Sequence, residues 1–201
     1  MPTTYEIQPY HSPPAPTLDW AEVAPYIGKL TEPRASMDEV TESDIRHWCE
    51  VMQDASLLYR DTEYARASPY GGMIAPPAMV QTWSMMGMGA SMDQYRRGIL
   101  ENPDDPHHKV NAALEKAGYT GVVATAQEQT YLKPIRPGDT IHYVMGVVHM
   151  TKNDSYTRQG VGRYYVLYYR FTNQKQEEVA NMTFRVLWYK PPMSTRRLYK
   201  G

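Results

Sequence analysis

The run EVANMTFRVLWYK at residues 178–190 alternates between apolar and polar side chains, which predicts a half-buried β-strand. Its apolar side chains share one face: Ala180, Met182, Phe184, Val186 and Trp188. Three earlier runs have a similar character, and the sequences RPGD at 136–139 and NQKQ at 173–176 supply turns between runs. The pattern predicts a meander of four long antiparallel strands, at residues 122–135, 139–150, 162–173 and 178–190.

Ahead of these strands, PPAMVQTWSMMGMGA at residues 76–90 predicts a helix that is buried on most sides. Proline is tolerated in a first helical turn, and nearly every later residue is apolar or small. The stretch RYYVLYYRF at 163–171 is apolar on both faces, so it is predicted to be covered on both sides. A curved antiparallel sheet wrapped around one buried helix satisfies both patterns, so the predicted fold is α+β, of the hotdog type.

The other segments are predicted to surround this unit in a single domain spanning residues 1–201. Residues 1–30 are Pro-rich and are expected to form an arm on the domain surface or on a partner. Thr41 is expected to cap a helix that ends near Asp54. Residues 92–118 are polar and broken by proline, so they are predicted to be a surface insertion with one helix at Lys109–Lys116. The exposed edges of such a sheet indicate an oligomer.

Composition narrows the possible partners. The net charge of the 201 residues is -1, which favours neither nucleic acid nor an anionic membrane. No segment has the apolar length of a membrane span, and the start of the chain is unlike a signal peptide. Cys49 is the single cysteine, so no internal disulfide and no cysteine zinc site can form, and a cytoplasmic location is expected. The adjacent His107 and His108 are weak evidence for a metal.

The stretch VMQDASLLYRDTEYARASPYGGMIAPPAMVQTW at residues 51–83 holds a lone acid, a tyrosine five residues later and a Pro-Pro pair. Hydration of an enoyl thioester needs a carboxylate and an imidazole that share a water, and N–H groups that hold the thioester oxygen. Asp54 supplies a carboxylate, but the next candidate along the loop is Tyr59, a poor base at neutral pH. Pro76 and Pro77 remove two N–H donors at the predicted helix start.

The runs VTESDIRHWCEVMQDASLLYRDTEYARASPYGGMIAPPAM and YLKPIRPGDTIHY resemble the MaoC-like dehydratase family, in particular its N-terminal-type domains. The resemblance places the family's catalytic Asp on Asp54 and its His on Tyr59, and it places Pro76-Pro77 where active members have a His-Gly pair. IAPPAMVQTWSMMGMG and AGYTGVVATAQEQTY are similar to the larger subunit of heteromeric steroid side-chain enoyl-CoA hydratases. That resemblance implies a small MaoC-like partner that carries the Asp and His, in a dimer of hotdogs or a heterotetramer.

The resemblance also implies binding of an acyl-CoA thioester, with no cofactor beyond the coenzyme A of the substrate. Each candidate residue has an alternative structural role: Asp54 can cap a turn, Tyr59 can pack, the apolar side chains can be core, and the cations can be solvated surface. The candidates for the acyl part are Asp54, Tyr59, Ala75, Met79, Trp83 and Met86. The candidates for the coenzyme A part are Arg60, Arg66, Lys133 and Arg136.

Two alternatives to the dependent subunit remain open. The first is a homodimeric hotdog module that binds an acyl-CoA without turning it over. The second is a self-sufficient dehydratase or thioesterase, whose base is Asp54 alone or a histidine from another strand, such as His142 or His149.

Overall fold

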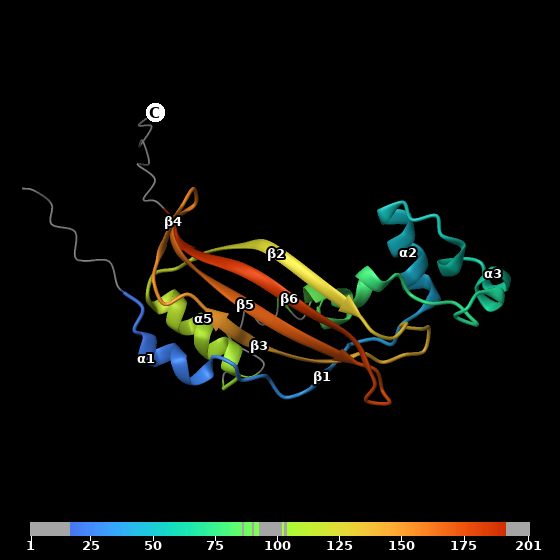
Figure 1. The fold of residues 1–201 in the computed structure, drawn as a ribbon, viewed down its shortest axis with the longest axis horizontal. Helices are drawn as coiled ribbons and strands as arrows, with labels where there is room; N and C mark the ends of the chain where they lie inside the picture. Colours follow the sequence, from blue (N-terminus) through green and yellow to red (C-terminus); the bar gives the residue numbers. More distant parts are fainter. Residues whose placement is uncertain (1–16, 86, 90, 93–101, 103, 192–201) are drawn as a thin grey trace, which may run out of the picture.

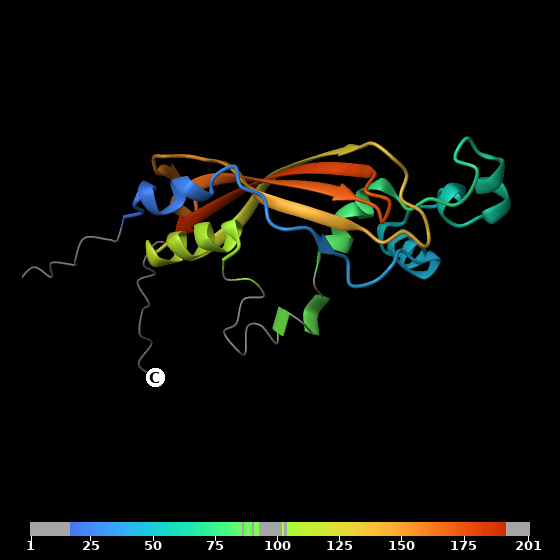
Figure 2. The ribbon, with the colours of Figure 1, turned by 90° about the horizontal axis from the view of Figure 1, so that it is seen from below.

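The computed structural model describes residues 17–85, 87–89, 91–92, 102 and 104–191. Within these residues a curved antiparallel sheet forms the body of the molecule, and helices lie against one of its faces (Figures 1 and 2). Figure 1 shows α1 (Trp20–Val23) and α5 (Pro106–Lys116) at one end of the sheet, and α2 (Glu42–Met52) and α3 (Thr62–Ala67) beyond the other end. The predicted position Met86, the first 16 residues of the arm and residues 93–101 and 103 of the insertion lie outside the described residues.

All four predicted strands form, but they do not make a simple meander. The strand order is β1-β3-β5-β6-β2, with β4 paired to β5. The strand β2 therefore pairs with β6, as Val122 does with Trp188, and not with its neighbour in sequence, β3. β1 and β4 were not predicted, because two or three residues are too few to show an alternation. The strands are β1 (Arg34–Ala35), β2 (Gly121–Tyr131), β3 (His142–Met150), β4 (Ser155–Thr157), β5 (Gly160–Thr172) and β6 (Glu178–Lys190).

The inner face of the sheet carries the core. The predicted apolar face of β6 is confirmed except at Phe184, which is half-buried; Ala180, Met182, Val186 and Trp188 are buried. In β5 the predicted burial on both faces is wrong: Tyr165 and Leu167 are buried, whereas the alternate residues are half-buried. Figure 2 shows the reason, because α5 and η3 (Pro77–Ser84) lie on one side of the sheet and no described helix covers its other side.

The helix α2 (Glu42–Met52) begins as predicted, with the Thr41 side chain accepting the N–H of Asp44. It ends at Gln53, which adopts the left-handed conformation with φ 55°. The short helices η2 (Leu57–Tyr59) and α3 (Thr62–Ala67) follow.

The long buried helix predicted for residues 76–90 is wrong. The structure has a 3-10 helix, η3 (Pro77–Ser84), which stops because Met85 is extended. Met79, Val80 and Trp83 are buried, but the side of η3 that carries Thr82 is exposed. With three residues per turn, Val80 and Trp83 fall on one side, and Pro77, Ala78 and Thr82 are exposed, so η3 is not buried all round.

A second helix, α5 (Pro106–Lys116), covers the other end of the sheet. It contains the helix predicted at Lys109–Lys116, and its Val110 and Leu114 are fully buried. The polar composition hid an apolar stripe at the spacing of an amphipathic helix. Asp105 caps α5 by accepting the N–H of His107, and it pairs with Arg34 of β1. The stripe is Val110, Ala113, Leu114 and Ala117.

The described part of the arm is integrated into the fold. It forms α1 (Trp20–Val23) and η1 (Ala24–Tyr26), and Val23 is fully buried, so this part packs against the domain. The chain then runs beside β3, where the N–H of Gly28 donates to the carbonyl of Val147 at 2.8 Å. A Cβ at Gly146 would lie 2.1 Å from the carbonyl oxygen of Lys29, so this crossing requires glycine.

Candidate functional site

Asp54 follows α2 and is half-buried. Its Oδ1 accepts the N–H of Ser56 at 3.0 Å, and its own N–H donates to the carbonyl of Cys49 at 2.8 Å. The carboxylate therefore holds the turn before η2, which is the structural role that the sequence left open. Within the described part of the chain, no hydrogen bond joins Asp54 to a histidine.

Tyr59 lies beside this turn and packs against the core. Burial raises the pKa of Tyr59 above its usual value, and the charge of Asp54 raises it further. Burial and Asp54 likewise raise the pKa of the Cys49 thiol. Both groups keep their protons at neutral pH, so Tyr59 can donate a hydrogen bond but cannot take a proton from water.

At the start of η3, three consecutive residues have no free N–H group to offer a ligand: Ala75, Pro76 and Pro77. The N–H of Ala75 is already used, because it donates to the carbonyl of Ile135 at 2.8 Å. Pro76 and Pro77 have no N–H. A cradle of backbone donors for a thioester oxygen is therefore missing at this position.

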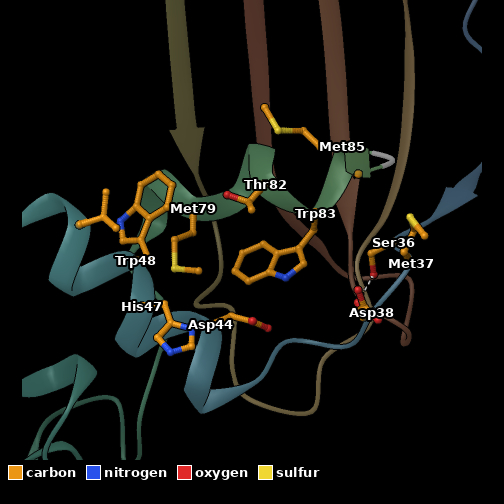
Figure 3. Close-up of a pocket in the computed structure, with 12 residues that line it drawn as sticks. Ser36, Met37, Asp38, Asp44, His47, Trp48, Met79, Thr82, Trp83 and Met85 are labelled. Carbon is orange, nitrogen blue, oxygen red and sulfur yellow. Dashed lines mark hydrogen bonds between the residues drawn. The ribbon is translucent and has the colours of Figure 1, made fainter. Parts of the chain in front are cut away.

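A cavity of about 390 Å³ lies between α2 and η3, and we refer to it as the α2–η3 cavity (Figure 3). Trp48 and Trp83 lie on either side of Met79 on its apolar wall. The predicted Met79 and Trp83 are thus both core residues and part of this wall. The lining residues are Ser36, Met37, Asp38, Asp44, His47, Trp48, Val51, Met79, Thr82, Trp83, Met85 and Gly87.

The α2 side of this cavity was missed by sequence reasoning. Asp44, His47, Trp48 and Val51 recur at i, i+3, i+4 and i+7, so they share one face of the helix. That spacing was the available signal. It was obscured by Ile45 and Cys49, which form the neighbouring buried stripe.

A smaller cavity of about 170 Å³ lies between the start of η3 and the sheet, and we refer to it as the η3–β6 cavity. It contains two of the predicted residues, Ala75 and Lys133. Its other walls come from the Tyr70 loop, the segment after β2 and the start of β6: Tyr70, Ile74, Pro77, Tyr131, Leu132, Pro134, Ile135, Val179 and Ala180.

The predicted cations do not form one cluster. Lys133 pairs with Glu177 at 2.6 Å and lines the η3–β6 cavity. Arg136 reaches the same region, since its guanidinium donates to the carbonyl of Tyr70 at 2.6 Å. Arg66 pairs instead with Glu63 on the exposed side of α3.

Arg60 is exposed beyond η2 and lies close enough to Cys49 to lower the pKa of that thiol slightly against the effect of burial. Neither alternative catalytic histidine joins the Asp54 turn. His142 stands opposite Ala35 of β1, and His149 lines a shallow hollow with Trp20.

No helix in the described ranges is both long and apolar enough to cross a membrane. Across the same ranges, no three His, Cys, Asp or Glu side chains are grouped so that they could hold a metal ion.

Residues 27–182 match the family described as the FAS1-like dehydratase domain region. The chain belongs to this family, and its hotdog fold is confirmed. A MaoC-like dehydratase of known structure is 17% identical with a TM-score of 0.57, and the match covers 84% of this chain and 43% of the other. At that identity the likeness concerns the fold alone.

Two curated relatives are more similar in sequence. The chain is 35% identical over 163 residues to the 3-oxo-4,17-pregnadiene-20-carboxyl-CoA hydratase alpha subunit of Mycobacterium tuberculosis, covering 80% of this chain and 48% of the relative. It is 34% identical over 168 residues to a probable enoyl-CoA hydratase alpha subunit of Thermomonospora curvata, covering 83% and 50%. The chain thus spans about half the length of these relatives.

A crystal structure of the ChsH1-ChsH2 complex from Mycobacterium tuberculosis contains a chain similar to this one. The two are 32% identical with a TM-score of 0.74, and the match covers 87% of this chain and 93% of that chain. The similarity therefore extends over nearly the whole described fold.

Proposed function

We propose that this chain is a subunit of a heteromeric enoyl-CoA hydratase that acts on a bulky, steroid side-chain enoyl-CoA thioester. A small MaoC-like partner supplies the catalytic Asp and His. The observation that carries the proposal is the Asp54 turn, in which the carboxylate holds a backbone N–H and faces a protonated tyrosine in place of an imidazole. Similarity to two hydratase alpha subunits and to a chain of a two-component complex supports it.

The chemistry of hydration explains why such a chain depends on a partner. Water adds its oxygen to the β-carbon of the enoyl group and a proton goes to the α-carbon, so a base and an acid must act on one water. Negative charge grows on the thioester oxygen and needs N–H donors. Tyr59 cannot take the proton, and Ala75, Pro76 and Pro77 offer no free donor.

In this proposal the chain contributes binding groups. Asp54, Tyr59, Ala75, Met79, Trp83 and Met86 serve the acyl part, and Arg60, Arg66, Lys133 and Arg136 serve the coenzyme A part. No cofactor is needed, because coenzyme A enters as part of the substrate. We propose a cytoplasmic enzyme of steroid breakdown, cholesterol included, assembled as a dimer of hotdogs or a heterotetramer; the single cysteine supports this compartment.

The test compares the purified chain, a candidate MaoC-like partner with an intact Asp and His, and their mixture. Hydration of a steroid side-chain enoyl-CoA is followed by loss of enoyl-thioester absorbance. We expect turnover from the mixture and none from this chain alone. Equal turnover by the lone chain refutes the dependent subunit. A homodimer that binds acyl-CoA and gains no turnover from any partner identifies a binding module instead.

A further inference from the structure

We propose that the α2–η3 cavity receives the uncharged, ring-bearing end of the acyl group, while the coenzyme A phosphates lie on the other side of η3, near Lys133 and Arg136. This assignment rests on the proposed function and specifies it. The helix η3 borders both cavities, with Pro77 on the smaller one and Met79, Thr82 and Trp83 on the larger. It therefore separates two environments of different size and charge.

Size distinguishes the two cavities. Sites for compact organic ligands usually enclose about 300–1,000 Å³. The α2–η3 cavity, at about 390 Å³, falls within that range, whereas the η3–β6 cavity, at about 170 Å³, is too small for a fused ring system. A bulky acyl group therefore fits only the larger of these two.

The lining of the larger cavity suits a flat apolar ligand. Trp48 and Trp83 present aromatic rings, and Met79 lies between them (Figure 3). Methionine adapts to irregular apolar shapes, and aromatic rings offer flat contact area. At the mouth, Met37, Val51 and Met85 are exposed by 68%, 81% and 62%. Exposed apolar side chains gathered around a hollow indicate a binding surface.

Charge distinguishes the cavities as well. The charged residues among those lining the α2–η3 cavity are Asp38 and Asp44, with His47 beside them, and none is Lys or Arg. The Asp44 carboxylate is held in place, since its Oδ2 accepts the hydroxyl of Thr41 at 2.7 Å. Such a rim disfavours phosphates and acyl groups that end in a carboxylate. The η3–β6 cavity has Lys133 on its wall and Arg136 beside Tyr70.

The first test narrows the cavity in the reconstituted complex with Val51→Trp. Val51 is mostly exposed, so the protein should fold, and the indole should occupy the cavity mouth. The matched control is Arg46→Trp, on the opposite face of α2. Both variants are assayed with a steroid enoyl-CoA and with crotonyl-CoA. We expect Val51→Trp to lower the ratio of kcat/KM for the steroid substrate to that for crotonyl-CoA by about tenfold or more, and the control to preserve the ratio.

An unchanged ratio for Val51→Trp overturns the assignment. If Val51→Trp no longer co-elutes with the partner on size-exclusion chromatography, the assignment is also overturned, because the cavity would then belong to the interface with the partner. Failure of the wild-type mixture on both substrates refutes the proposed function instead. To separate the two ideas further, binding of the saturated steroid acyl-CoA to wild type and Val51→Trp is measured by calorimetry, since binding requires no turnover.

The second test addresses charge. Asp38→Asn removes one rim carboxylate whose side chain makes no hydrogen bond in the described part of the fold. We expect it to tighten binding of an acyl-CoA with a terminal carboxylate about two- to fivefold, with no change for the uncharged analogue of equal size. If Asp38→Asn changes the binding of both ligands equally, or of neither, the proposal that the rim carboxylates disfavour charged acyl groups is overturned.

Discussion

The two ends of the sheet differ in how their polar side chains are paired and how well their apolar side chains are buried. At the α5 end, Asp105 pairs with Arg34, and Asp154 accepts hydrogen bonds from Tyr119 and Arg163 at 2.6 Å. Tyr119 is fully buried there. Each of these charged groups faces a partner of opposite charge or a hydrogen-bonding group, as expected where side chains leave water.

At the α2 end, by contrast, the packing is incomplete. Asp54 uses one oxygen to hold a turn, Val51 and Met85 are exposed, and a cavity remains between α2 and η3. Exposed apolar side chains and unfilled volume cost stability. The α5 end therefore satisfies its buried polar groups, whereas the exposed apolar side chains of the α2 end support the binding role proposed for it.

The largest expected effect comes from breaking the ion pair at the α5 end. Arg34→Met leaves the Asp105 carboxylate, whose side chain is 2% exposed, without its cation. We expect the free energy of unfolding to fall by about 3–5 kcal/mol, measured by urea denaturation. Glu63→Gln, which breaks the exposed Arg66–Glu63 pair, is the control and should cost less than about 1 kcal/mol. Similar losses in both variants would remove the contrast between the ends.

Truncating one apolar side chain at each end sharpens the comparison. Leu114→Ala removes a fully buried side chain from α5 and should cost about 2–5 kcal/mol. Val51→Ala removes an exposed one from α2 and should stay within about 0.5 kcal/mol. Both losses in the free energy of unfolding are calculated from the midpoint of urea denaturation, provided that the dependence of that free energy on urea concentration is unchanged. A comparable loss for Val51→Ala would mean that the cavity mouth is structural.

His107 at the α5 end is expected to make the stability of the fold depend on pH. Burial lowers the pKa of His107 from 6.5 to about 4, the neighbouring His108 and Arg34 lower it too, and Asp105 opposes the shift. The Asn111 amide donates to Nε2 of His107 at 3.1 Å, which requires that nitrogen to be unprotonated. Because the unfolded chain takes up a proton first as the pH falls, stability is retained above pH 6.5 and lost towards pH 4.

The expected loss over that interval is about 3 kcal/mol, at about 1.4 kcal/mol per unit of pKa shift. Urea denaturation at several pH values measures it. His107→Gln should flatten the profile between pH 6.5 and 4. A profile that stays steep without His107 would assign the acid sensitivity to another group.

The sequence predicted the four long strands and the α2 cap because period-two alternation and Thr41 act locally. It did not predict that β2 pairs with β6, since pairing across the sheet depends on distant contacts. A helix at Lys109–Lys116 was predicted, and α5 forms there with one more turn at its start. Its burial against the sheet was not predicted, because histidines, lysines and glutamate dilute the apolar stripe.

The candidate site was predicted in part. The sequence identified Asp54, Tyr59 and the two prolines, because a missing imidazole and missing N–H groups can be read from residue types alone. The cavity itself could not be read, since Trp48 and Val51 come from α2 and Trp83 from η3, and only the fold brings these elements together. The sequence also could not show which predicted cations lie together. Lys133 and Arg136 both lie near Tyr70, whereas Arg66 pairs with Glu63 on α3.

The smallest expected effect lies at the Asp54 turn. Asp54→Asn keeps an oxygen that can accept the N–H of Ser56, so the turn should persist. If the partner supplies the acid and base, kcat/KM of the complex should fall by less than about tenfold, which is about 1.4 kcal/mol of barrier. Steady-state hydration of a steroid enoyl-CoA by the complex measures this.

The matched variant replaces the catalytic Asp of the partner by Asn, and it should abolish turnover. If Asp54→Asn abolishes turnover while the complex still assembles and melts at the wild-type temperature, the carboxylate of this chain acts on the reacting water. The α2 end would then be catalytic and not only a binding region. Tyr59→Phe separates the two cases further, because removing the hydroxyl should leave turnover nearly unchanged if Tyr59 only packs against the core.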